Sequence, residues 1–148
     1  MTKARLAIPL LPAWLIWAPL GWADGESTGF NVVVNAANPV TALSRDEIAR
    51  LFLKKTNTWP NGSPVVPVDQ RSDSIGRQAF CRDVLRKDLS EISSYWNQMI
   101  FSGRAAPPLA KGSDDDVLAY VRANPNAIGY VADRTPLGQG IKILAILK

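Results

Sequence analysis

The sequence of 148 residues contains no histidine and only one cysteine, Cys81. Without histidine, the Ser-His-Asp and Cys-His arrangements of nucleophilic catalysis are excluded, and so are most zinc sites. Paired carboxylates at a catalytic spacing and a phosphate-binding loop of the nucleotide type are also missing. We therefore expect that the protein is not an enzyme and that it holds no metal or cofactor.

A single cysteine cannot form a disulfide within the chain, so a disulfide framework is excluded. Cys81 follows Phe80 in an apolar pattern of helical period. A cysteine in such a pattern is typically a small buried core residue, and a reactive thiol is the less favoured interpretation.

Charge is scarce at the start of the chain. Lys3 and Arg5 are the only charged residues before Asp24, and they precede an apolar run that is interrupted only by prolines. Small residues close this segment, so we expect a secretory signal peptide, residues 1–23, that is removed in the mature protein. The run is short and broken by proline, which disfavours a retained membrane anchor. The mature domain, residues 24–148, is therefore expected in the periplasm.

The formal net charge of the whole chain is +4, and two of its basic residues are Lys3 and Arg5. The remaining excess of positive charge is small, and the basic residues do not cluster with aromatic residues. Nucleic acid is therefore not expected as a partner.

Apolar patterning divides the rest of the chain into alternating strands and helices. The expected strands are 30–38, 65–70, 127–133 and 141–147, and the expected helices are 41–55, 74–86, 90–101 and 113–124. Pro67 should place the second strand at a sheet edge or a strand end. No repeat and no interior linker is present, so we expect one domain of the α/β class in which helices cover the sheet.

Several of these helices begin at residues that favour helix N-termini. Ser44 is followed three residues later by Glu47, which is the capping-box pattern. Ser90 is expected to cap the helix at 90–101, in which Ile92 and Ile100 belong to the apolar stripe. The acidic run at 114–116 suits the positive end of the last helix, an interpretation that we favour over a metal site.

Polar residues crowd into the junction between the second strand and the second helix. The stretch VPVDQRSDSIGRQAF, residues 66–80, changes there from an apolar run to a dense mixture of charges and hydroxyls. In open α/β sheets, ligands bind beyond the carboxyl ends of the strands, and a helix N-terminus offers free N–H groups that suit an anion. The candidate ligand-binding residues are Arg71, Ser72, Asp73, Ser74, Gly76 and Arg77.

These residue types have recognisable roles at an anion. Arg71 offers a planar fork that matches phosphate or carboxylate, and Gly76 lets the backbone approach closely. Ser74 can cap the helix and also bond a ligand oxygen, while Asp73 can orient Arg71 or accept a proton from a monoprotonated oxyanion. The same residues also fit a charged loop with an ordinary helix cap and a solvated Arg71–Asp73 pair. The residues alone favour this second interpretation.

Most of the mature chain resembles the phosphate-binding periplasmic proteins of ABC transporters. The matching segments are LSRDEIARLFLKKTNTWPNG, PVDQRSDSIGRQAF, YWNQMIFSGRAAPP and VLAYVRANPNAIGYV, in the same order and spacing as in the family. The resemblance implies a type II periplasmic-binding fold, here as a single lobe with a mixed sheet flanked by helices. The family's first lobe, with its own threonine and serine contacts, is not expected in this chain.

In that family, an arginine, an aspartate two residues later and a Ser-Gly-Thr sequence at the start of the helix hold phosphate. Arg71, Asp73 and Gly76 match this pattern, whereas Ile75 stands at the serine position and Arg77 at the threonine position. Two hydroxyl donors are thus replaced, although Arg77 can supply positive charge instead.

The resemblance implies an exported solute-binding-like protein that binds phosphate or a similar oxyanion and is linked to phosphate uptake or sensing. Its partners would be that anion and a membrane permease or a second copy of the chain. The alternative is a protein-interaction or sensory module that keeps the lobe fold but has lost ligand binding. One lobe cannot close over an anion, which leaves this alternative open.

Overall fold

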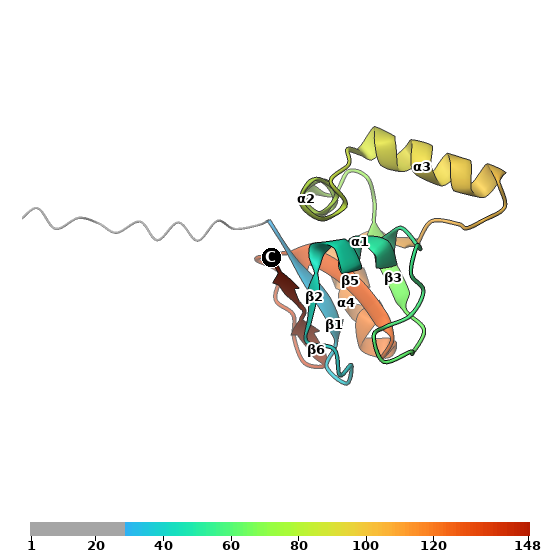
Figure 1. The fold of residues 1–148 in the computed structure, drawn as a ribbon. Helices are drawn as coiled ribbons and strands as arrows, with labels where there is room; N and C mark the ends of the chain where they lie inside the picture. The colour runs from blue at the N-terminus through green and yellow to red at the C-terminus, as the bar shows by residue number, and fades with distance from the viewer. Residues whose placement is uncertain (1–28) are drawn as a thin grey trace, which may run out of the picture.

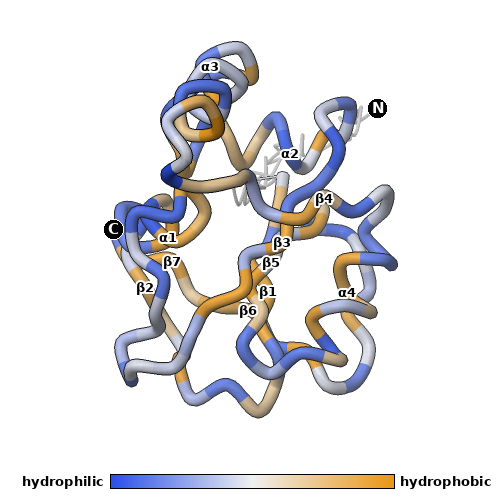
Figure 2. The backbone as a smooth tube through the Cα atoms, turned by 90° about the vertical axis from the view of Figure 1, so that its right-hand side faces the viewer, coloured by the Kyte–Doolittle hydropathy of each residue, from blue (hydrophilic) through white to orange (hydrophobic). Residues whose placement is uncertain are grey.

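The computed structural model describes residues 29–148, and the expected signal peptide lies outside this range. Five strands form one mixed sheet in the order β4-β3-β5-β1-β6, which can be followed in Figure 2; Figure 1 shows the fold from the side. Their bounds are Phe30–Asn35 for β1, Val66–Gln70 for β3, Leu109–Lys111 for β4, Ala127–Ala132 for β5 and Ile141–Ile143 for β6. β3 runs parallel to β4 and β5, whereas β1 is antiparallel to β5 and β6. The expected α/β class with a mixed sheet is confirmed.

Alternate side chains of the central strands point into two separate cores, one on each face of the sheet. Val32 and Val34 of β1 belong to the core under helices α1 (Arg45–Phe52) and α2 (Ile75–Phe80). Val33 belongs to the core under α4 (Asp114–Ala123). Because helices cover both faces, the central strands are apolar almost throughout, and Figure 2 shows hydrophobic segments running through them.

Gly129 of β5 leaves no room for a side chain between the sheet and α4. A Cβ atom placed on this residue would lie 2.7 Å from Cγ1 of Val117 in α4. The position therefore requires glycine for steric reasons.

Helix starts agree with the sequence pattern in most places. Ser44 caps α1 and forms the predicted capping box with Glu47. α3 (Leu89–Phe101) begins one residue earlier than expected, because Asp88 caps it and forms a capping box with Glu91. The prediction that Ser90 is the cap was therefore wrong: Asp88 is the stronger acceptor at this end, and the Ser90 hydroxyl only donates to it.

The second expected helix is continuous but changes type along its length. After α2, residues Cys81–Leu85 form a π-helical segment, η1, which ends at Arg86 in the left-handed conformation with φ of 53°. Cys81 is buried, as its apolar context predicts.

α3 stands away from the sheet at the top of Figures 1 and 2. It is attached through Ile92 and Trp96, which pack with Leu53 and Cys81 in a third small core. Ile100, expected in the apolar stripe, is instead 53% exposed, and the neighbouring Phe101 is 91% exposed. The stripe loses contact there because the end of the helix projects beyond the surface that it packs on.

Three short strands were not anticipated as separate elements. β2 (Ala42–Ser44) occupies the start of the expected helix 41–55, which begins only at Arg45, and pairs in parallel with β7 (Ala145–Leu147). β4 lies between the expected helices 90–101 and 113–124. The expected strand 141–147 is split into β6 and β7, which join different sheets. Pro67 lies near the start of β3, before the pairing with β4 begins at Val68. The predicted position at a strand end is thus confirmed.

Candidate functional site

The candidate site is the loop that joins β3 to α2, residues 71–74. Arg71 continues the hydrogen bonding of the sheet through its N–H, which donates to the carbonyl of Lys111 at 3.2 Å. The loop then turns at once, because the N–H of Ser74 donates back to the Arg71 carbonyl at 3.1 Å. The predicted residues therefore lie at the carboxyl end of a parallel strand, where ligands bind in open α/β sheets.

Arg71 and Asp73 form the outer part of the corner that this loop makes with the first turn of α2. Their side chains are 66% and 70% exposed and are joined by an ion pair of 3.3 Å between Nη2 and Oδ2. Such an exposed pair contributes little to stability, so both groups can change partners at small cost. The stem of Arg71 lies close to Gly112, where an added Cβ would be 3.9 Å from Cδ.

Ser72 is exposed beside this pair, and Ile75 projects into solvent with 80% of its surface exposed. Ile75 therefore offers no polar group at the position where the resembling family has serine. The N–H groups of Ile75 and Gly76 donate to no atom of residues 29–148. Ile75 thus leaves its N–H accessible at the start of α2. Gly76 is buried beside Ser74 and Ala132, so its backbone does not face an external ligand as the sequence suggested.

Ser74 faces inward rather than toward the loop. Its hydroxyl accepts a hydrogen bond from the N–H of Arg77 at 3.3 Å and donates to Oε1 of Gln70. The predicted helix cap is confirmed, but the hydroxyl proton is already used by Gln70 and is not available to an external anion.

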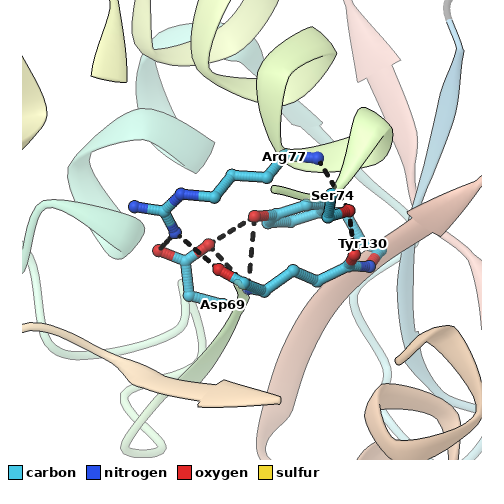
Figure 3. A network of polar contacts seen from close by, with 5 residues as sticks. Asp69, Ser74, Arg77 and Tyr130 are labelled. Carbon is cyan, nitrogen blue, oxygen red and sulfur yellow. Dashed lines mark hydrogen bonds and ion pairs between the residues drawn. The ribbon is translucent and has the colours of Figure 1, made fainter. Parts of the chain in front are cut away.

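Arg77 is turned toward the interior as well (Figure 3). Its Nη1 pairs with Oδ2 of Asp69 and donates to the carbonyl of Gln70 at 3.0 Å. The side chain is only 13% exposed, and its Nε is buried without a partner among the described residues. Burial lowers the pKa of Arg77, but the Asp69 carboxylate outweighs this effect and raises it above the ordinary value. Arg77 therefore balances a buried carboxylate instead of offering charge at the surface.

Asp69 also accepts a hydrogen bond from the hydroxyl of Tyr130 in β5. Burial, followed by the neighbouring Asp69 carboxylate, raises the pKa of Tyr130 well above its ordinary value. The Tyr130 ring stacks on Phe80 of α2, with ring centroids 4.1 Å apart. This contact fixes the helix above the strand, while the raised pKa keeps the Tyr130 hydroxyl protonated as the donor to Asp69.

Gln70 links the same network to α4. Its Nε2 donates to Oδ1 of Asp114 and to the carbonyl of Tyr130, both at 2.7 Å. The other oxygen of Asp114 accepts from the Ala132 N–H and from the Thr135 hydroxyl. Asp114 thus joins two strands and a loop, in addition to its place in the first turn of α4.

Sequence reasoning did not identify this inner network of Asp69, Gln70, Tyr130 and Asp114. A usable indication was present, because Asp69 and Gln70 are polar residues at the end of a strand that is otherwise apolar. Their partners lie on β5 and α4, more than forty positions along the chain, so the pairing itself depended on the fold.

Within residues 29–148, no group of three or more acidic or cysteine side chains is arranged to hold a metal ion. The helices of this range are also too short or too polar for any of them to cross a membrane.

No protein-family model matches the sequence, and no curated protein matches it, but solved structures do. An ABC-type phosphate transport receptor from Vibrio cholerae superposes with a TM-score of 0.60 at 21% identity over 78% of this chain. A phosphate ABC transporter substrate-binding protein from Clostridium perfringens, solved with bound phosphate, gives 0.63 at 19% identity over 80% of the chain. PstS from Borrelia burgdorferi gives 0.61 at 13% identity over 80%.

These similarities define the class of fold: the chain has the architecture of one lobe of a phosphate ABC transporter substrate-binding protein. The expected fold class and the resemblance inferred from the sequence segments are thereby confirmed. The match covers 45%, 44% and 47% of the three solved chains, so this chain spans less than half of their length.

Proposed function

We propose that the protein binds phosphate or a similar oxyanion at the corner formed by Arg71, Asp73 and the first turn of α2. The supporting observation is that an exposed arginine and the unpaired N–H of the exposed Ile75 lie together at a strand end, in a fold shared with phosphate receptors. Arg71 donates to the anion through its guanidinium, and the N–H of Ile75 adds a neutral donor. Gly76 is buried and shapes the turn behind them.

Ser72 and Asp73 complete the corner from the exposed side. The Ser72 hydroxyl is free to donate, and Asp73 accepts the proton of a monoprotonated oxyanion or holds Arg71 in place. We revise the roles of Ser74 and Arg77, because their side chains and backbone N–H groups all have partners within the fold: they shape the corner and do not contact the anion.

The proposed setting is the periplasm, after removal of residues 1–23, as a binding protein without enzymatic activity. Its partners would be the anion itself and a membrane permease or a second copy of the chain. Release of a mature protein that starts anywhere other than Asp24 would contradict the proposed cleavage.

The anion proposal is tested by thermal unfolding at fixed ionic strength in phosphate, sulfate and chloride. Phosphate at a hundredfold excess over its dissociation constant stabilises the folded state by roughly 2.7 kcal/mol, a rise in melting temperature of roughly 10 °C. Arg71→Ala should remove the phosphate-specific rise, whereas Arg50→Glu on α1 should keep it. An equal response to phosphate and chloride, or an unchanged response in Arg71→Ala, would show that this corner does not bind phosphate.

A further inference from the structure

A second surface, at the opposite end of the α2–η1 helix, has its own chemistry. The C-terminal ends of α1 and η1 meet around an open hollow of about 450 Å³, which we call the basic hollow. It is lined by Asp46, Ala49, Arg50, Leu53, Lys55, Val84, Leu85, Arg86 and Lys87. Eleven helical residues separate it from Ser74, which corresponds to roughly 16 Å along an α-helix.

The floor and the rim of the basic hollow differ in character. Ala49 and Leu53 from α1, together with Val84 and Leu85 from η1, make an apolar floor. Leu53 and Val84 are themselves core residues, with 4% and 2% of their surfaces exposed. An apolar group of a partner can therefore reach the edge of the packed interior here.

Four basic side chains surround this floor, and each helix end supplies two of them. Arg50 and Lys55 come from the end of α1, and Arg86 and Lys87 come from the end of η1. None of the four forms an ion pair within residues 29–148, where the ion pairs involve Arg71, Arg77 and Arg82.

Basic residues are common at helix C-termini, where they complement the helix dipole and bond the last carbonyls. Backbone donors already serve those carbonyls here. The N–H groups of Lys55 and Thr56 bond the carbonyl of Arg50, and that of Lys87 bonds the carbonyl of Cys81. The four side chains make no such bonds among the described residues, so their donors remain available to a partner.

Basic side chains outnumber acidic ones around the basic hollow. Asp88 and Glu91 line the next hollow together with Arg82, Arg86 and Lys87, and each carboxylate accepts the other residue's N–H in the capping box of α3. Asp46 is the acidic side chain in the basic hollow itself, and it pairs with none of the four cations. Asp46 also lines a neighbouring depression, where Arg45, Arg86 and Lys148 are the basic residues.

We propose that the basic hollow is a docking site for an acidic peptide segment of a partner protein, with one apolar side chain between acidic residues. Cations at both helix ends require negative groups on both sides of the apolar contact, which a segment of this kind provides. A free inorganic anion would leave the floor unused, and the concave surface does not fit a flat membrane. This proposal does not depend on anion binding at Arg71.

The probe is a synthetic peptide, Glu-Glu-Phe-Glu-Glu, titrated into the protein while amide NMR signals are followed. Binding should shift the amides of residues 49–55 and 84–87, and should weaken as salt is added. Replacing the phenylalanine by serine should weaken binding severalfold, and Lys-Lys-Phe-Lys-Lys should not bind. Shifts elsewhere, equal binding of the serine peptide, or binding to anionic phosphatidylglycerol vesicles without peptide binding would overturn the proposal.

The chain offers a matched pair of variants. Arg86 and Lys54 are both basic, both end a helix, and both have φ of 53°, but Lys54 does not line the hollow. Arg86→Gly and Lys54→Gly therefore remove the same charge and relax the same backbone conformation, so both should fold. Arg86→Gly should weaken peptide binding roughly threefold and Lys54→Gly less than twofold, given the usual strength of exposed charge pairs.

Arg50→Glu, combined with Arg86→Gly, should weaken peptide binding roughly tenfold or more. Arg71→Ala should leave peptide binding unchanged, so that failure of the anion site and failure of the basic hollow give different results. Equal losses in Lys54→Gly and Arg86→Gly would show that net charge alone is responsible and would overturn the assignment to the hollow.

Discussion

At the residue scale, two Arg–Asp pairs lie within nine positions of each other and have opposite roles. Asp69 and Arg77 are about 14% and 13% exposed and are held by Tyr130 and Gln70. Arg71 and Asp73 are largely exposed, and within residues 29–148 their charged groups pair with each other. The first pair is part of the scaffold, and the second remains free to meet a ligand.

This difference predicts unequal effects on stability. Arg77→Met leaves the Asp69 carboxylate buried without its counter-charge, so the free energy of unfolding should fall by about 3 kcal/mol. Arg71→Ala removes an exposed pair and should change it by less than about 1 kcal/mol. Urea unfolding of both variants measures the difference. Similar losses in the two variants would mean that the inner pair does not support the fold.

The local chemistry of the candidate site was predictable, but the direction of its side chains was not. The sequence pattern predicted the Ser74 cap and the exposed Arg71–Asp73 pair, because turns and caps depend on near neighbours. It could not show that Arg77 turns away, since Asp69 becomes its partner only when α2 folds back over the end of β3. The Asp69 carboxylate is largely removed from water and needs a counter-charge. The Arg77 guanidinium therefore pairs with it instead of facing the exposed loop.

At the element scale, the close contact of β5 with α4 at Gly129 gives the next prediction. Gly129→Ala would bring a methyl group to 2.7 Å from Val117, and this overpacking should lower the free energy of unfolding by about 1–3 kcal/mol. Gly112→Ala is the matched control, because its new methyl would meet neighbours only at 3.8 Å or beyond.

Thermal unfolding of Gly129→Ala and Gly112→Ala compares a methyl group that clashes with one that does not. The double variant Gly129→Ala, Val117→Ala should recover part of the lost stability, since the smaller partner makes room for the methyl group. If Gly129→Ala were as stable as Gly112→Ala, α4 would have to lie farther from the sheet than the structure shows.

Longer elements were predictable from the sequence, and the shortest ones were not. The helices carry their own caps and a period that can be recognised within one segment, as Ser44 and Glu47 show for α1. β2 and β7 have three residues each and pair across about a hundred positions of the chain. Such strands have no pattern of their own, because a distant partner supplies their hydrogen bonds.

At the scale of the whole molecule, the two proposed binding surfaces lie at opposite ends of one helical segment and are proposed to bind different ligands. The corner at Arg71 lies where β3 ends, and the basic hollow lies where η1 ends, so the α2–η1 helix connects them. The network around Tyr130 and the stacked Phe80 ring anchor the first half of that helix to the sheet. Because α2 is fixed in this way, the two surfaces can be altered independently.

The global stability of the protein should fall in alkaline solution. Burial raises the pKa of Cys81 from the ordinary value of 9.0 to about 11, and the pKa of Tyr130 is raised as well. Between about pH 9 and pH 11, the folded state keeps the proton of the Cys81 thiol while the unfolded state loses it. Unfolding therefore releases protons, and the free energy of unfolding decreases as pH rises above about 9, by at most about 1.4 kcal/mol per pH unit for one group.

Denaturant unfolding at neutral pH and at about pH 10 measures this loss, and Cys81→Ala isolates the thiol. The variant is expected to be less stable at neutral pH, because it leaves a small void beside Trp96 and Ile92. Between neutral pH and about pH 10, the free energy of unfolding of Cys81→Ala should nevertheless fall by less than that of the unchanged protein. Of Cys81 and Tyr130, only Tyr130 remains in the variant to contribute to the loss. Equal alkaline losses in both proteins would show that the Cys81 thiol titrates alike in the folded and unfolded states, and hence that it is not enclosed by Leu53 and α3.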